Sequence, residues 1–446
     1  MSKSLRLFLF LLFFFAFLIS APIVVLYTAG YRVDLTHGRI VHTAVLNISS
    51  NPRNASVRLD DETVAQERTP AVMDTILPGE HTIILEKQNY LPWETTLSFE
   101  SREARVLGPI VLFLDEQPTL QQSLQATLTS VHAESNRFVY ATQESSWVEV
   151  WIVDATTSHT RLLMRLPYTA TSTYAFSWSA NAEYLALIET HGSRQDISVT
   201  RVRDGMAVDL PKETQNVEAS WWDLEVASRL YVRTGTQITQ IAMERLDTVR
   251  FPYAAWLVTT REENIVTLSE SGKRSVVSFQ EGETASILTY LPLGTYHFVE
   301  APGNLIALED TRHHRLVLLD PENREQPILL NEEATLWRWH PSENILLYSS
   351  GYDLKRYIRS AHETQTITRL STPIDALDWY PEGNCVLYRS GGELVALNLD
   401  DVTILSQTVL TTNLPGTFWL NPNGTSLSSL IQTQTGWEWW TRALQN

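Results

Sequence analysis

The fold is decided by the stretch LWRWHPSENILLYSS, Leu336–Ser350, and by its near-copy ALDWYPEGNCVLYRS, Ala376–Ser390. Each copy contains a tryptophan, a Pro-x-Glu turn that ends in Asn, and an apolar run that closes on Leu-Tyr. The copies begin about 40 residues apart, which is the period of propeller blades. The sequence therefore indicates a repeat protein made of small sheets.

Further copies of this template occur throughout the second part of the chain. Phe176–Leu187 and Phe298–Leu308 follow it closely, and weaker copies begin near Val131, Trp222, Trp256 and Trp419. The eight starts lie about 34 to 47 residues apart, and each repeat has room for the four short strands of one blade. A blade needs neighbours on both faces to bury its apolar side chains, so the ring must close.

We therefore predict a mainly β protein with a β-propeller over residues 118–446. Eight blades are favoured and seven are the alternative, because the copy at Trp256 is faint. The last copy, Thr417–Asn446, has room for only three strands. We expect Thr119–Leu128 to supply the fourth strand and so to close the ring.

The N-terminal segment is apolar from Leu5 to Tyr27, with Arg6 as its only charge. About 20 such residues span a bilayer as a helix. Lys3 and Arg6 precede the apolar core, which places the N-terminus in the cytoplasm and the bulk of the chain outside. A signal peptide cleaved near Ala21 is the alternative. Because the apolar run continues beyond that point, we favour an uncleaved transmembrane signal anchor over residues 1–27.

After a connector at residues 28–42, residues 43–115 have strand patterning without a helical segment. Apolar and polar side chains alternate in Ala44–Ser49 and Ala55–Leu59, and Leu77–Glu80 reads as a turn. Such a series favours a small antiparallel β-sandwich.

Two parts of the chain, residues 43–115 and the repeats, each resemble a known family. The order of Asn51–Leu59, Thr69-Pro70, Leu77–His81 and Asn89–Glu94 resembles a PEGA domain. Two departures are Asp60-Asp61, where that family prefers an Asn/Asp-Gly pair, and Asn89, where a glycine commonly precedes the tyrosine. This resemblance implies an envelope-facing spacer or interaction module and carries over no catalytic residue. The repeats resemble TolB-type or WD-like propellers, which is a signal of fold and not of function.

Composition narrows the classes of partner and the redox chemistry. Acidic residues outnumber basic ones by 51 to 34, and a net charge of -17 repels phosphate backbones, so we expect no nucleic-acid partner. The single cysteine, Cys385, lies in an apolar run and is predicted to be a buried, inert thiol.

No catalytic, cofactor or metal site is predicted, and no binding residue is assigned. The sequence has no Gly-x-Ser-x-Gly, His-Glu-x-x-His or P-loop motif. The four histidines considered as metal ligands include an adjacent pair, whose side chains would point to opposite faces of a strand; they are His297, His313, His314 and His340. Asn398–Asp401 and Asn421–Thr425 are interpreted as turns, and Trp437–Trp440 as blade packing in preference to a carbohydrate platform.

These observations favour a binding or scaffold protein. A propeller held to the membrane by Leu5–Tyr27 would engage envelope proteins or cell-wall polymers through its central-channel face. The alternatives are a glycan-active hydrolase or lyase, whose acidic residues would come from several blades, and a component of a stable assembly.

Overall fold

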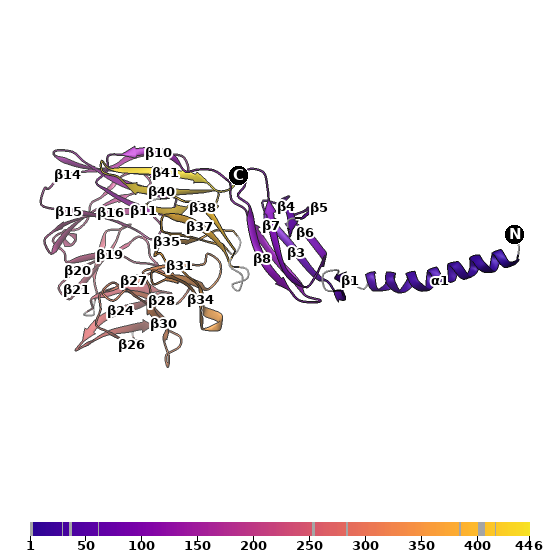
Figure 1. Ribbon diagram of the computed structural model, residues 1–446. Coiled ribbons are helices and arrows are strands. Elements are labelled where there is room, and N and C mark those ends of the chain that lie inside the picture. Colours follow the sequence, from indigo (N-terminus) through magenta and orange to yellow (C-terminus); the bar gives the residue numbers. More distant parts are fainter. Residues whose placement is uncertain are drawn as a thin grey trace.

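The computed structural model describes residues 3–28, 30–34, 38–60, 62–251, 255–281, 284–382, 385–399, 406–414 and 416–446. An N-terminal helix, a small β-sandwich and a ring of sheets follow one another along the molecule (Figure 1). Some residues of the predicted turns lie outside the described residues: Asp61, Gly383, Asn384, Asp400 and Asp401.

The helix α1, Lys3–Thr28, projects away from the rest of the molecule. Its segment Arg6–Thr28 is long and apolar enough to cross a membrane, and none of it is buried inside the protein. The predicted connector contains a short antiparallel hairpin, formed by β1, Tyr31–Asp34, and β2, Arg39–His42. Arg32 ties the hairpin to the helix, because its Nη1 donates to the carbonyl of Tyr27 at 2.8 Å.

The sandwich consists of two sheets with strand orders β6-β3-β9 and β5-β4-β7-β8. Its strands are β3, Ala44–Asn51; β4, Ser56–Leu59; β5, Glu62–Arg68; β6, Ala71–Ile76; β7, Gly79–Glu86; β8, Trp93–Phe99; and β9, Ala104–Val111. The alternating residues of β3 point into the core, where Leu46 and Ile48 are fully buried. Each such side chain contributes about 1.5–3 kcal/mol to stability.

One pair of strands in the sandwich contradicts the predicted antiparallel arrangement. The strands β3 and β9 run parallel, with Val45 opposite Ala104 and Asn51 opposite Val111. The chain leaves the second sheet after β8, crosses to the first sheet and enters beside β3 in the same direction. Parallel neighbours need such a crossover, and alternation of side chains along a strand does not reveal it.

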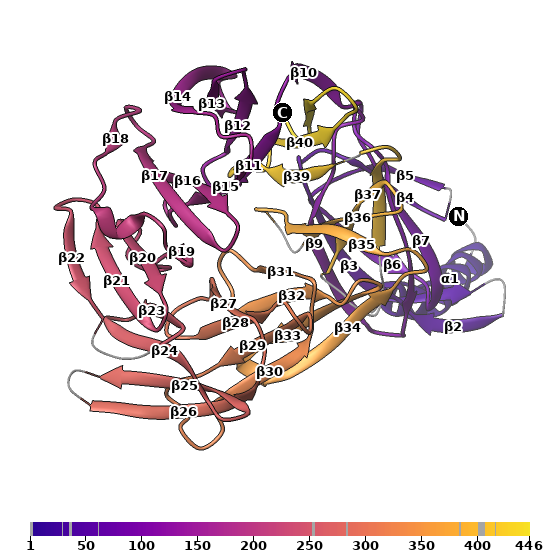
Figure 2. The ribbon, with the colours of Figure 1, turned by 90° about the vertical axis from the view of Figure 1, so that its left-hand side faces the viewer.

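The ring contains eight four-stranded sheets among the described residues, and each sheet pairs antiparallel throughout. In Figure 2 the strand nearest the centre is the first strand of each of the first seven sheets, and β39 in the eighth. The first three sheets are formed by β11 (Leu128–His132), β12 (Arg137–Gln143), β13 (Trp147–Asp154) and β14 (His159–Pro167); by β15 (Thr173–Trp178), β16 (Tyr184–His191), β17 (Arg194–Arg201) and β18 (Ala207–Val208); and by β19 (Ala219–Trp222), β20 (Arg229–Thr234), β21 (Gln237–Ala242) and β22 (Asp247–Arg250). The fourth and fifth sheets are formed by β23 (Leu257–Arg261), β24 (Asn264–Ser271), β25 (Arg274–Glu281) and β26 (Thr284–Pro292), and by β27 (Tyr296–Val299), β28 (Ile306–Asp310), β29 (Arg315–Leu319) and β30 (Ile328–Glu333). The sixth and seventh sheets are formed by β31 (Leu336–Trp339), β32 (Ile345–Ser349), β33 (Asp353–Ile358) and β34 (Glu363–Arg369), and by β35 (Ile374–Trp379), β36 (Cys385–Ser390), β37 (Glu393–Asn398) and β38 (Ser406–Thr411).

The eighth sheet joins the two ends of the propeller. It has the order β10-β41-β40-β39, with β39, Thr417–Leu420; β40, Ser426–Gln432; and β41, Trp437–Ala443. Its outermost strand is β10, Thr119–Leu124, which pairs antiparallel with β41. The predicted closing strand is therefore confirmed. It ends at Leu124 and not at Leu128, where β11 of the first sheet begins.

Apolar clusters fill the spaces between consecutive sheets all the way around the ring. Eight such clusters are found among the described residues, and one of them joins the eighth sheet to the first. In that cluster Trp439 lies edge-on to Phe138, with ring centroids 5.3 Å apart. The ring is thus a closed β-propeller, as the repeat predicted.

The sandwich is packed firmly against the propeller. Phe113 contacts Tyr380 edge-on, with centroids 5.2 Å apart, and both side chains are buried. Arg442, which is 1% exposed, donates its Nη2 to the carbonyl of Leu114 at 3.0 Å and its Nε to that of Glu116 at 2.8 Å. The C-terminal strand therefore holds the segment that links the two domains.

Candidate functional site

The repeated tryptophans join neighbouring sheets by hydrogen bonds. Trp339 donates its indole N–H to the carbonyl of Glu300 in the preceding sheet at 3.1 Å, and Trp379 donates to the carbonyl of Arg338 at 3.1 Å. Trp222 makes the same kind of bond to the sheet before it. These bonds satisfy the indole N–H groups and link the ends of these inner strands to the sheets before them.

A funnel opens where the inner strands end and turn into the second strands. Two cavities of about 790 and 560 Å³ meet there and share Glu134, Glu300, Trp339 and Pro341. Residues from all eight sheets line them. The charged and aromatic lining residues, which define the funnel below, are Glu134, Glu183, Glu225, Glu244, Glu300, Asp378, Arg261, Arg338, Trp337, Trp339 and Trp379.

Two carboxyl groups of the funnel have raised pKa values. Glu300 touches solvent, but desolvation by the funnel walls raises its pKa, and the negative charge of Glu134 adds to the effect. Desolvation also raises the pKa of Asp378, which Arg338 opposes from 3.7 Å. Carboxyl groups of this kind can hold a proton or pair with a cation more readily than a fully hydrated one.

Arg261 is the buried charge of the funnel. It ends the inner strand β23, is 8% exposed, and its Nη2 has no hydrogen-bond partner among the described residues. Burial lowers the pKa of its guanidinium. A buried donor without a partner costs about 1–3 kcal/mol, and more when it is charged.

A buried polar network fixes the backbone beside Arg261. Asp223 is fully buried and accepts hydrogen bonds from the hydroxyls of Tyr231 at 2.8 Å and Thr260 at 2.7 Å. Arg229 donates to Thr260 at 2.7 Å and lies 3.5 Å from Asp223. The network joins the third and fourth sheets, so the position of Arg261 is set by its neighbours and not by a mobile loop.

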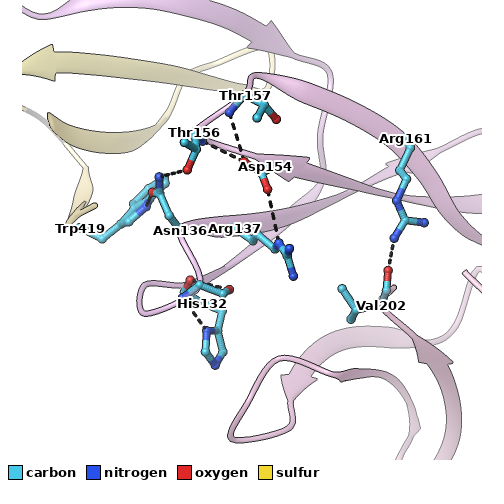
Figure 3. A network of polar contacts seen from close by, with 10 residues as sticks. His132, Asn136, Arg137, Asp154, Thr156, Thr157, Arg161, Val202 and Trp419 are labelled. Carbon is cyan, nitrogen blue, oxygen red and sulfur yellow. Dashed lines mark hydrogen bonds and ion pairs between the residues drawn. The ribbon is translucent and has the colours of Figure 1, made fainter. Parts of the chain in front are cut away.

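A second network lies where the ring closes (Figure 3). Trp419 of the last sheet donates its indole N–H to Asn136 Oδ1 at 2.8 Å, and Asn136 donates to Thr156 at 3.0 Å. The backbone N–H of Thr156 in turn donates to Asp154 at 3.0 Å. These bonds are internal to the propeller, and we assign them a structural role.

The four histidines considered from the sequence are spread over different parts of the fifth and sixth sheets. His313 and His314 lie in the turn between β28 and β29, His297 lies within β27, and His340 follows β31 at the funnel. Within the described part of the chain, no three His, Cys, Asp or Glu side chains form a group that could hold a metal ion. His313 instead lies 2.5 Å from Asp310.

The remaining sequence interpretations concern packing and turns. Trp439 is 2% exposed and packs in the closing cluster, so the packing interpretation of the C-terminal tryptophans is confirmed for this residue. Asn421–Thr425 forms the turn between β39 and β40, in which Asn421 accepts from the backbone of Ser426 at 2.9 Å. Cys385 is buried, as predicted.

Sequence reasoning missed Arg261 and Glu300. Both stand at the end of an inner strand, directly after short apolar or hydroxyl-bearing runs. The repeat template carries no signal for them, since Arg261 lies five positions after Trp256 whereas Glu300 lies two positions after Phe298.

Comparison with known proteins places a PEGA domain at residues 43–107. No curated protein matches the chain. Among solved structures, Porphyromonas gingivalis dipeptidyl peptidase 4 is 10% identical with a TM-score of 0.48, over 68% of this chain and 56% of that one. The propeller domain of the Trilobed protease from Pyrococcus furiosus is 11% identical with a TM-score of 0.40, over 64% and 96%.

An uncharacterized protein from Listeria monocytogenes EGD-e is 10% identical with a TM-score of 0.41, over 65% of this chain and 97% of that one. Likeness at these values carries no information about activity. The chain is thus a β-propeller protein with an N-terminal PEGA domain and a candidate membrane-spanning helix.

Proposed function

We propose that this protein is a membrane-anchored extracytoplasmic binding and scaffold protein whose funnel engages an envelope protein or a cell-wall polymer. The funnel carries the proposal, because it is a concave site with charged and aromatic side chains from many sheets. Sites of this kind at the mouths of closed β structures are the usual places for ligands.

The order of the parts along the chain supports this role. The helix α1 would anchor the protein with Lys3 and Arg6 on the cytoplasmic side. The PEGA domain lies between α1 and the propeller (Figure 1), so it would separate the propeller from the membrane. It contacts the rim of the funnel, since Asn51 Nδ2 donates to Glu382 in the turn after Pro381, a residue of the funnel wall. The partner would therefore approach from the side that faces the anchor.

Capture from envelope extract tests the binding role. The full-length protein in detergent is compared with a variant that carries Glu134→Lys and Glu225→Lys, two exposed changes in the funnel. A matched control carries Glu270→Lys and Glu322→Lys, which are exposed elsewhere. We expect a specific partner to bind the wild type and the control and to be lost from the funnel variant. Equal capture by all three proteins, or no specific capture, would contradict the proposal.

Cysteine labelling tests the topology. In a Cys385→Ser background, Ser101→Cys places one exposed thiol on the PEGA domain. A membrane-impermeant maleimide should label this thiol in intact cells. Labelling only after lysis would place the domain in the cytosol and refute the anchor orientation.

The second candidate function is a glycan-active hydrolase or lyase. The raised pKa values of Glu300 and Asp378 favour it, because a protonated carboxyl group is what a general acid requires. Release of reducing or unsaturated sugar ends from wall polymer, abolished by Glu300→Gln, would support it. Binding of polymer without any product would favour the scaffold role.

A further inference from the structure

The funnel combines one buried cation with several carboxylates that touch solvent. Among the residues that the structure describes, five glutamates line its larger cavity, and Arg261 is the single arginine there. Its Nη2 is buried, and no described residue accepts a hydrogen bond from it. An acceptor supplied by a ligand would remove the cost of this buried donor.

The acids around Arg261 do not satisfy it. Asp223 is already committed to Tyr231 and Thr260, and Glu225 accepts from the backbone of Glu262 at 2.7 Å. No carboxylate lies within 4.0 Å of the Arg261 guanidinium among the described residues, although their charges act on it. Arg261 is therefore free to form a bidentate pair with a carboxylate from outside, which is the geometry its planar group favours.

The carboxylates of the funnel suit a cation. Glu134 and Glu300 line both cavities, and the charge of Glu134 adds to the raised pKa of Glu300 against the opposing charges of His132, Arg261 and Arg338. An ammonium group beside both glutamates would relieve their repulsion. A smaller cavity of about 370 Å³ between the first two sheets also contains arginines, but these have partners within the protein. Arg161 donates to the carbonyl of Val202, and Arg137 lies 3.6 Å from Asp154 (Figure 3).

We propose that the funnel binds a zwitterionic amino acid or short peptide, with a free carboxylate on Arg261 and a free ammonium beside Glu300 and Glu134. This inference rests on the proposed function and adds the chemical class of the ligand. The apolar wall formed by Ala301, Pro302 and Trp339 would cover the carbon skeleton between the two charged ends. A peptide of a wall polymer and the terminus of a protein share this chemistry.

Calorimetric titration of the full-length protein in detergent with dialanine tests the inference. We expect the dipeptide with both ends free to bind, and either N-acetylation or C-amidation to weaken binding by at least about tenfold, the value of one charge-assisted pair. Comparison of the L,L and D,D forms distinguishes the sources, since D-residues belong to wall peptides and L-residues to proteins.

Variants assign the two ends of the ligand. Arg261→Met should weaken the free dipeptide at least about tenfold but leave the C-amidated form unchanged, and Glu300→Gln should abolish the preference for a free amine. Arg261→Lys keeps a buried charge without the bidentate geometry and serves if the methionine variant does not fold. Arg245→Met, an exposed change outside the funnel, is the control.

Three results would overturn the inference: blocked dipeptides that bind as tightly as the free one, Arg261 variants that bind like the wild type, or no binding of any dialanine. If envelope partners are still captured through the funnel, only the ligand class is wrong. If capture fails as well, the proposed function fails with it.

Discussion

The hydrogen bond that closes the ring offers the sharpest test of the fold. Trp419 is 1% exposed and donates to Asn136, which is itself 4% exposed (Figure 3). Substitution Trp419→Phe removes the indole N–H and leaves Asn136 Oδ1 buried without its donor. The cost of such an acceptor is about 1–3 kcal/mol. The smaller ring also leaves a cavity of roughly 40 Å³, worth about 1 kcal/mol at 24 cal/mol per Å³.

We therefore expect Trp419→Phe to lower the free energy of unfolding by about 2–4 kcal/mol. The matched control is Trp147→Phe, because Trp147 is 40% exposed. It should cost less than about 1 kcal/mol. Urea unfolding of the full-length protein in detergent, followed by far-ultraviolet circular dichroism, measures both variants without relying on tryptophan fluorescence.

A double-mutant cycle isolates the bond itself. Asn136→Ala alone should be destabilising, and the cycle with Trp419→Phe should show a coupling of about 0.5–3 kcal/mol. If Trp419→Phe cost no more than Trp147→Phe, or if the two closing residues showed no coupling, the account of ring closure by this bond would be wrong.

Three further predictions follow from the junction and the core. Arg442→Met leaves the carbonyls of Leu114 and Glu116 without their hydrogen-bond donor and should lower the free energy of unfolding by about 2–5 kcal/mol. Arg245→Met should change it by less than about 0.5 kcal/mol in the same urea series. Phe113→Ala should loosen the PEGA domain from the propeller, so that limited proteolysis cuts between them sooner than in the wild type; an unchanged pattern would show that this contact does not hold the junction. Burial, with the charge of Asp310, raises the pKa of Tyr296 to about 12, while an unfolded tyrosine ionises near pH 10, so the stability from this group is complete below about pH 10 and is lost as the pH rises through 12. Tyr296→Phe should flatten that alkaline loss in a pH series of unfolding measurements, and an unaltered slope would contradict the shift.

The repeat determined the propeller from sequence alone. Apart from Trp256, which precedes β23, each template tryptophan lies at or beside the end of an inner strand. The same short strand, turn and strand recur, and each local segment carries its own turn residues and apolar run. The closing strand β10 was also predictable, since the last repeat lacked one strand. The apolar N-terminal helix and the PEGA pattern were readable for the same reason: their signals are local.

Only the tertiary structure decided which distant segments of the chain come into contact. The parallel pairing of β3 with β9 depends on a crossover between sheets, and the grip of Arg442 on the interdomain segment joins residues more than 300 positions apart. The funnel is of the same kind, because Arg261 and Glu300 belong to different sheets and gain their properties from burial and from one another's charge. Burial and electrostatic coupling arise between segments distant in the chain, so the sequence determined the ring, whereas the packed ring determined the site.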